Sequence, residues 1–429
     1  MDSEWFGSSQ ITENKRVIFE SDGMRLKAFR CYLVVFYIGL SFVIPSRGGD
    51  WPNWLGPERN GVSRELLPDE VQIGDLLWEA EIGIGFSSIS ISRGSLYAIG
   101  HRDGQETAWK LCAETGAVEA SFSYPAELLP KLHEGGPAAT PSVAKEQVIL
   151  MSKDGQLRVL TKDLSQVFWE KSMMEESELQ RIPEWGFAAS PVIMGDLVLV
   201  EAGATFAYDL KTGKERWRSK FYRPAYGTPH VFQLDGKRFV AVLKTDGLVI
   251  LCAETGETLG FSLWRTSFQT NSTTPLEIGE GKFFISTGYD RGCCLFVFNG
   301  ENLSTNYENM NMCNHMGNSV LMKGALYGFD GTAHRGREVE FTCLDPVSGE
   351  KQWHFEGLGY GSVIGVGDDL IVLTEVGELL IGAAATDGFV SRAKKQVLDG
   401  RCWTPPVFAN GILYARNAEG RLVAQRLGQ

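Results

Sequence analysis

A short element recurs along this chain at intervals of 38 to 52 residues, and it constrains the fold more than any other feature. Its clearest copy, Ala189 to Arg218, reads as four short strands separated by turns that contain glycine. The opening position recurs at Ser88, Thr140, Ser190, Thr228, Thr274, Asn318, Gly361 and Thr404. Five of these residues precede a proline, which a sheet tolerates at the start of a strand.

The hexapeptide Leu-Cys-Ala-Glu-Thr-Gly occurs twice, at Leu111–Gly116 and Leu251–Gly256. The separation of 140 residues equals three intervals of the repeat, so the two copies occupy the same place in the first and fourth elements. Related turns stand at Tyr208–Gly213 and Leu344–Gly349, and an aromatic residue follows each turn. The hexapeptide is therefore predicted to be the turn between a third and a fourth strand, and not a catalytic motif.

Four strands per element and this period predict a β-propeller. The last element, Thr404–Leu427, contains only three strands, and a lone strand at Leu76–Ile82 precedes the first element. We predict an all-β, eight-bladed propeller of four-stranded antiparallel blades, closed by the N-terminal strand, which completes the last blade and leaves no open edge. Seven blades is the alternative if the seventh element is misassigned.

The composition indicates a globular protein with an acidic surface. Apolar residues make up 43% of the chain, charged residues 22%, and the formal net charge is −12. This charge argues against a nucleic-acid partner, because phosphate binding requires a basic surface.

Residues 24–49 differ from the rest of the chain. A basic stretch, Met24–Arg30, is followed by an apolar run, Cys31–Ile44, and by small and turn-forming residues up to Gly49. This order is typical of a signal peptide, although an uncleaved anchor is the alternative. We expect residues 1–23 to be a misassigned extension, 24–49 to be the signal or anchor, and 50–429 to be one exported domain of the periplasm or cell envelope. Membrane contact is expected only through an uncleaved N-terminal segment.

The turn [Asp/Cys]-x-x-[Thr/Ser]-Gly followed by tryptophan resembles the repeat of the quinoprotein-type propeller family, which includes PQQ-dependent alcohol dehydrogenases and the outer-membrane assembly protein BamB. The lead-in Asp50–Ser63 is similar to the start of exported PQQ-binding-like propeller proteins, which are common in planctomycetes. Three further stretches match, at Trp185–Pro191, Asn314–Ser319 and Arg401–Pro405. The resemblance spans about Asp50 to Gln429, and it is specific for fold and weak for activity.

For an enzyme of this family the resemblance implies PQQ with calcium over the propeller axis, held near an acidic residue, an asparagine and a catalytic aspartate. This sequence shows no such set in the matching order. Its one adjacent cysteine pair, Cys293 and Cys294, is predicted to lie in the third strand of blade five with the two sulfurs on opposite faces. We therefore expect no catalytic residue, no metal and no cofactor. A binding or scaffolding module that takes a protein or glycan at a propeller face is the first hypothesis, a PQQ dehydrogenase the second, and a glycan-binding propeller the third.

A ligand site is expected at the mouth of the central channel, in the loops that lead from the fourth strand of one blade to the first strand of the next. The side chains of these loops that we single out are His133, Glu134, Trp185, Tyr226, Asn271, Asn314, His315, Tyr360, Arg401 and Trp403. Structural alternatives remain for several of them. The two tryptophans would also serve as a channel plug or as blade packing, His315 as a hydrogen-bonded core imidazole, and Arg401 as a donor to a backbone carbonyl.

Overall fold

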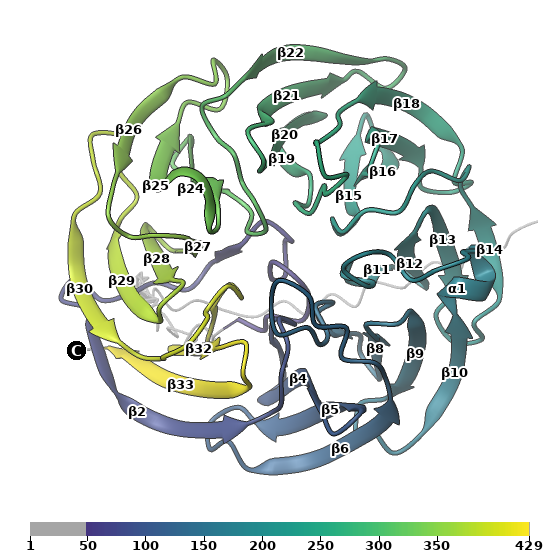
Figure 1. The fold of residues 1–429 in the computed structure, drawn as a ribbon, viewed down its shortest axis with the longest axis horizontal. Coiled ribbons are helices and arrows are strands. Elements are labelled where there is room, and N and C mark those ends of the chain that lie inside the picture. Colours follow the sequence, from purple (N-terminus) through teal and green to yellow (C-terminus); the bar gives the residue numbers. More distant parts are fainter. Residues whose placement is uncertain (1–48, 429) are drawn as a thin grey trace, which may run out of the picture. The chain divides into compact units, whose positions relative to one another are not determined.

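Eight sheets surround a common axis in the computed structural model (Figure 1), which describes residues 49–428. The predicted extension and nearly all of the predicted leader lie outside the described residues. One short helix, α1 (Met173–Glu176), interrupts an otherwise all-β chain over this range. None of the described helices is long and apolar enough to cross a membrane. The predicted all-β propeller with eight blades is confirmed.

Blades 1 to 4 follow the chain, and each runs from an innermost to an outermost strand. Blade 1 contains β3 (Ser90–Ser92), β4 (Ser95–Arg102), β5 (Gln105–Cys112) and β6 (Val118–Pro125), and blade 2 contains β7 (Ser142–Val143), β8 (Gln147–Met151), β9 (Gln156–Thr161) and β10 (Val167–Ser172). Blade 3 contains β11 (Val192–Met194), β12 (Leu197–Ala202), β13 (Ala204–Asp209) and β14 (Glu215–Arg218), and blade 4 contains β15 (His230–Leu234), β16 (Lys237–Leu243), β17 (Gly247–Cys252) and β18 (Thr258–Leu263).

Blades 5 to 8 continue the ring. Blade 5 contains β19 (Leu276–Gly279), β20 (Lys282–Thr287), β21 (Gly292–Phe298) and β22 (Leu303–Asn309), and blade 6 contains β23 (Val320–Met322), β24 (Ala325–Thr332), β25 (Arg335–Leu344) and β26 (Lys351–Phe355). Blade 7 contains β1 (Val62–Ser63), β27 (Gly361–Val366), β28 (Asp369–Thr374), β29 (Glu378–Ala383) and β30 (Ser391–Gln396), and blade 8 contains β31 (Val407–Ala409), β32 (Ile412–Arg416), β33 (Arg421–Gly428) and β2 (Gln72–Glu81).

Ring closure occurs in blade 8, where the N-terminal strand β2 pairs antiparallel with the C-terminal strand β33 (Figure 1). This confirms the predicted closure. Arg416, fully buried on β32, reinforces it by donating hydrogen bonds to the carbonyl oxygens of Gly83 and Ile99, both at 2.8 Å, and of Ser87 at 3.2 Å. These three carbonyls belong to blade 1 and the segment that leads into it, so one side chain joins the two ends of the ring.

Tryptophans on the outermost strands of four blades form hydrogen bonds to the blade that follows. The indole Nε1 donates to a backbone carbonyl of the following blade in four places, at 2.9 to 3.0 Å: Trp78 to Ala113, Trp169 to Leu210, Trp217 to Ala253 and Trp353 to Ala385. The predicted packing of these tryptophans between blades is thereby confirmed.

The residues that open the repeats form hydrogen bonds between neighbouring blades near the axis. The backbone amides of Ser88, Thr140 and Ser190 each donate to the hydroxyl of the next residue in the series, at 2.9 to 3.1 Å. Thr274 likewise donates its backbone amide to Asn318 Oδ1 at 3.2 Å. The recurrent hydroxyl is therefore a structural feature of the inner ring.

The adjacent cysteines lie on β21, the third strand of blade 5, as expected. Cys293 packs in an apolar cluster with Met312 and Leu326, whereas Cys294 packs in another with Phe283 and Trp264. Strand alternation thus sends the two thiols to opposite faces of the sheet.

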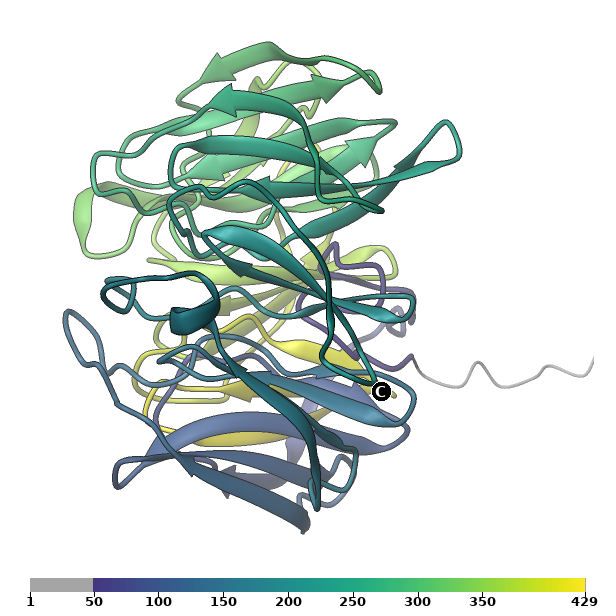
Figure 2. The same ribbon diagram turned by 90° about the vertical axis from the view of Figure 1, so that its right-hand side faces the viewer.

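The lead-in segment crosses one end of the channel, as the purple loop on the right-hand side of the ring in Figure 2 shows. Its strand β1 pairs with Gly365 and Val366 at the end of β27, opposite to the loops that precede the innermost strands. Its other bonds reach four more blades: Trp51 N to Ile91 O, Val143 N to Pro52 O, Arg59 Nη2 to Ile193 O, and Trp54 Nε1 to Thr274 Oγ1. The segment therefore closes this end of the channel.

Candidate functional site

A cavity of about 870 Å³ lies at the other end of the channel, above Trp54. Two sets of connections line it: the loops that enter the innermost strands, and the hairpins between the second and third strands. Both sets lie on one face because the first strand leaves that face and the antiparallel second strand returns to it. Trp54 forms the floor, and the loops that do not repeat form the walls.

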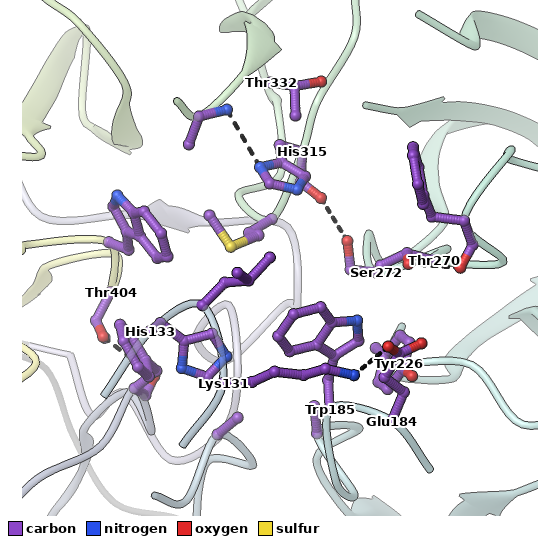
Figure 3. A pocket seen from close by; sticks show the side chains of 18 of the residues that line it. Lys131, His133, Glu184, Trp185, Tyr226, Thr270, Ser272, His315, Thr332 and Thr404 are labelled. Carbon is purple, nitrogen blue, oxygen red and sulfur yellow. Dashed lines mark hydrogen bonds and ion pairs between the residues drawn. The ribbon is translucent and has the colours of Figure 1, made fainter. Parts of the chain in front are cut away.

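Six of the ten residues singled out in the sequence line this cavity: His133, Trp185, Tyr226, His315, Arg401 and Trp403. Figure 3 shows four of them, His133, Trp185, Tyr226 and His315, around the central space. Glu134 lies just outside the lining and forms an ion pair with Arg401 at 3.2 Å.

The other three residues are buried and hold loops in place. Asn271 donates its side-chain amide to the carbonyls of Lys244 and Trp264 at 2.8 and 3.0 Å. Asn314 donates to the carbonyl of Phe329 at 3.1 Å and accepts a hydrogen bond from a serine hydroxyl. The hydroxyl of Tyr360 accepts from two consecutive backbone amides at 3.0 and 2.7 Å.

Aromatic rings cover much of the wall. The imidazole of His133 stacks on the indole of Trp185, with 5.3 Å between the ring centroids, and makes an edge-to-face contact with Phe86 at 4.9 Å. Phe86 in turn stacks on Trp403, with 5.8 Å between the centroids. In another part of the lining, the ring centroids of Phe268 and Tyr289 lie 4.8 Å apart. Flat apolar surfaces of this kind bind planar groups by stacking.

Basic side chains outnumber acidic ones in the lining. The cations are Lys131, Lys153, Arg335 and Arg401, and the acid is Glu184. Lys131 pairs with Glu184 (Figure 3) and Arg401 with Glu134, whereas Lys153 and Arg335 have no carboxylate within 4.0 Å among residues 49–428. The guanidinium groups lie over aromatic rings, Arg335 at 4.3 Å from Phe268 and Arg401 at 4.3 Å from Trp403.

Lys153 reaches the cavity from the turn between β8 and β9, and only 1% of the residue is exposed. Its backbone amide donates to Glu106 Oε1 at 2.9 Å, and its backbone carbonyl accepts from Phe187 at 2.9 Å. The backbone of Gly186 covers its methylene chain so closely that a Cβ there would lie 2.6 Å from Lys153 Cδ. Burial lowers the pKa of Lys153 to about 8, and the nearby Glu106 only partly opposes this shift.

Two histidines of the lining are neutral at physiological pH. Burial lowers the pKa of both His133 and His315 to about 4, with further contributions from Lys153 and Arg401 for His133 and from His334 for His315. His315 Nδ1 accepts the backbone N–H of Ala333 at 3.3 Å, so its Nε2–H donates to the Tyr289 hydroxyl at 2.9 Å. The Tyr289 O–H is thus free to donate within the lining.

The lining does not fit a calcium–quinone centre. Calcium takes six to eight oxygen ligands, usually with several carboxylates. Glu184 is the one carboxylate of the described lining and is paired with Lys131, and the two asparagines singled out in the loops, Asn271 and Asn314, are buried against backbone groups. The cations and flat rings would accommodate an anionic quinone by itself.

Four further residues line the cavity that the sequence did not identify as candidates: Lys153, Tyr289, His334 and Arg335. All four belong to hairpins between second and third strands, such as Ser152–Gly155, which read as ordinary turns. The available signal was topological: in a four-stranded antiparallel blade these hairpins share a face with the loops that enter the first strand.

Comparisons with known proteins agree with this architecture. Residues 70–231 match a family model described as outer membrane protein assembly factor BamB. The structure is similar to BamB from Moraxella catarrhalis, with 17% identity, a TM-score of 0.59, and coverage of 82% of this chain and 100% of that one. It is also similar to a europium-containing methanol dehydrogenase, with 10% identity, a TM-score of 0.63, and coverage of 88% and 98%.

A third similar structure is the quinohemoprotein alcohol dehydrogenase from Comamonas testosteroni, with 11% identity, a TM-score of 0.64, and coverage of 88% of this chain and 80% of that one. At these identities the likeness concerns the fold. No curated protein sequence matches the chain. Residues 70–231 thus match the BamB family model, and the described chain has the fold of an eight-bladed propeller.

Proposed function

We propose that this chain is a non-catalytic binding propeller of the cell envelope and that its ligand site is the axial cavity. The observation that carries the proposal is the charge of the lining, four basic side chains against one acidic, in a protein whose formal net charge is −12. Together with the stacked rings of Phe86, Trp185 and Trp403, this lining suits a flat ligand that carries negative charge. An uncharged glycan would leave Lys153 and Arg335 without a counter-charge.

The envelope location rests on two supports of different kinds. The sequence predicts a signal or anchor at residues 24–49, and the matching family model is described as an outer membrane assembly factor. A protein partner that presents an acidic, aromatic group at the open face of the ring would use the same cavity as a free small molecule.

A PQQ-dependent dehydrogenase is the competing function. The absence of free carboxylates from the described lining disfavours it, because no calcium site is formed there. We expect purified protein supplied with PQQ and calcium to leave alcohols and sugars unoxidised in a dye-linked assay. Turnover that depends on both additions would replace the binding proposal with the enzymatic one.

Binding itself is tested by titrating PQQ against tryptophan fluorescence, with and without calcium. Trp54, Trp185 and Trp403 line the cavity, so an occupant will quench them. The proposal predicts saturable quenching at micromolar ligand that calcium does not change. Quenching that appears only with calcium, or a linear response without saturation, would contradict it.

A further inference from the structure

Lys153 combines burial, access to the cavity and the lack of a partner. Its residue is 1% exposed, yet it lines the cavity. Among residues 49–428, its Nζ forms no hydrogen bond and has no carboxylate oxygen within 4.0 Å. The other fully buried lysine, Lys244, differs sharply, since its Nζ is bonded to Glu201, to the carbonyl of Gly203 and to Thr205. Lys244 is structural, whereas the amine of Lys153 is left for an occupant of the cavity.

The surroundings of Lys153 fix the position of its amine. Glu106 holds the backbone at one end, and Gly186 with its positive φ of 72° covers the methylene chain. A lysine held this way has few rotamers left, so its amine is already ordered before a ligand arrives.

The charge state of this amine favours nucleophilic chemistry. With a pKa near 8, about a quarter of the amine is neutral at pH 7.5, which is over a hundredfold more than for an ordinary lysine. The titratable groups that face it are Glu106, whose pKa burial raises to about 7, and His133, which is neutral above about pH 4. Neither forms a hydrogen bond or ion pair with Nζ.

We propose that Lys153 captures an aldehyde or ketone that also carries an anionic group, by forming a reversible imine in the axial cavity. This inference rests on the proposed function of the cavity as a site for flat anions. The neutral Nζ attacks the carbonyl carbon and forms a C–N bond. The carbonyl oxygen then leaves as water with the two amine protons, and the nitrogen lone pair becomes the second bond of C=N. No oxidant or reductant is needed, and hydrolysis releases the ligand.

The cavity supplies the rest of the recognition. Arg335 has no carboxylate partner among the described residues and is available to the anionic group. Trp185 and Phe86 line the cavity and supply aromatic surface beside which a conjugated ring would lie. An aromatic aldehyde with a carboxylate, such as 4-formylbenzoate, therefore contains every group that the site would recognise.

The test is reductive trapping of full-length protein with 4-formylbenzoate and cyanoborohydride, followed by peptide mass mapping. We expect Lys153 to be labelled at least about tenfold faster than any other lysine, at a rate that rises with pH through about 8. Benzaldehyde, which lacks the anion, should label it several-fold more slowly. Lys153→Met and Lys153→Arg should abolish this label, whereas Lys237→Met, at an exposed position on β16, should leave it unchanged.

Labelling spread evenly over surface lysines, or an undiminished rate in Lys153→Arg, would overturn the inference. Circular dichroism melting of the variants separates loss of fold from loss of the amine. Calorimetry with terephthalate, which has no carbonyl to capture, tests the cavity alone. If terephthalate binds and no imine is trapped, only this inference fails; if neither occurs, the proposed function fails with it.

Discussion

The indole of Trp217 donates a 3.0 Å hydrogen bond to the carbonyl oxygen of Ala253 in the next blade, and its ring lies directly over Gly256. Gly256 ends the second copy of the repeated hexapeptide and has a φ of 73°. Gly116, which ends the first copy, lies in the same way beneath Trp78. The hexapeptide recurs because its glycine and its neighbouring carbonyl form the receiving surface for the tryptophan of the preceding blade.

This relationship predicts that Gly256→Ala is more destabilising than its backbone conformation alone would make it. A Cβ at Gly256 would lie 2.4 Å from Trp217 Cε3, whereas one at Gly236, with a φ of 74°, would meet nothing within 4 Å. Both variants incur the strain of a positive φ, about 1 kcal/mol. We expect Gly256→Ala to lose a further 1–3 kcal/mol or so of unfolding free energy in urea denaturation. Equal losses in the two variants would contradict the packing role.

Arg416 is predicted to be essential for ring closure. Arg416→Met removes the hydrogen bonds to the carbonyls of Gly83, Ser87 and Ile99 and a longer one to Asn417, which outweighs the gain from removing a buried charge. The expected loss is about 2–4 kcal/mol of unfolding free energy. The exposed Arg426 on β33 is the matched control, and Arg426→Met should change stability by less than about 0.5 kcal/mol. A similar effect of both substitutions would show that the closure does not depend on this clamp.

Trp54 is predicted to serve both the fold and the site. Trp54→Phe removes the 3.0 Å hydrogen bond to Thr274 Oγ1 but keeps an aromatic ring at the floor, so it should cost about 1 kcal/mol and keep ligand binding. Trp54→Ala also removes the floor of the cavity, so it should weaken the binding of flat anions as well. Thermal unfolding and calorimetric titration of both variants distinguish the two effects. Unchanged affinity in Trp54→Ala would mean that the ligand does not reach the floor.

The pH dependence of stability is predicted to contain a contribution from His315. Its folded-state pKa of about 4 lies below the ordinary value of 6.5, so the unfolded chain takes up a proton first as the pH falls. The stabilisation by neutral His315 is complete above pH 6.5 and is lost between pH 6.5 and 4, up to about 3 kcal/mol. The difference in unfolding free energy between wild type and His315→Gln should therefore shrink from pH 7 to pH 4.5. A difference that does not vary with pH would contradict a buried neutral imidazole.

The ring of eight blades could be predicted because the repeat encodes contacts between consecutive blades. The turn glycine and the tryptophan after it are local in sequence, and the hydroxyls before the prolines mark the inner ring. The closure of the ring could also be predicted, since the last element has three strands and the lone first strand supplies the fourth. The path of the lead-in segment could not be predicted, because contacts of Trp51, Trp54 and Arg59 with several blades determine it.

The site was only partly predictable for a different reason. Sequence identifies loops that do not repeat, but it does not tell whether their polar groups face the cavity or the backbone. The side-chain amides of Asn271 and Asn314 donate to backbone carbonyl groups, whereas His133 and Trp185 line the cavity. Lys153 resembled any hairpin lysine, because its burial depends on Gly186, which is distant in sequence and which the fold packs against its methylene chain.

The central claim, that the axial cavity binds flat anions through its unpaired cations, is tested most directly by calorimetric titration of benzene-1,3,5-tricarboxylate into wild type, Arg335→Gln and the surface control Arg426→Gln. We predict saturable binding to wild type that Arg335→Gln weakens about tenfold, that Arg426→Gln leaves unchanged, and that added salt weakens. An absence of binding to wild type, or an equal affinity in all three proteins, would contradict the account.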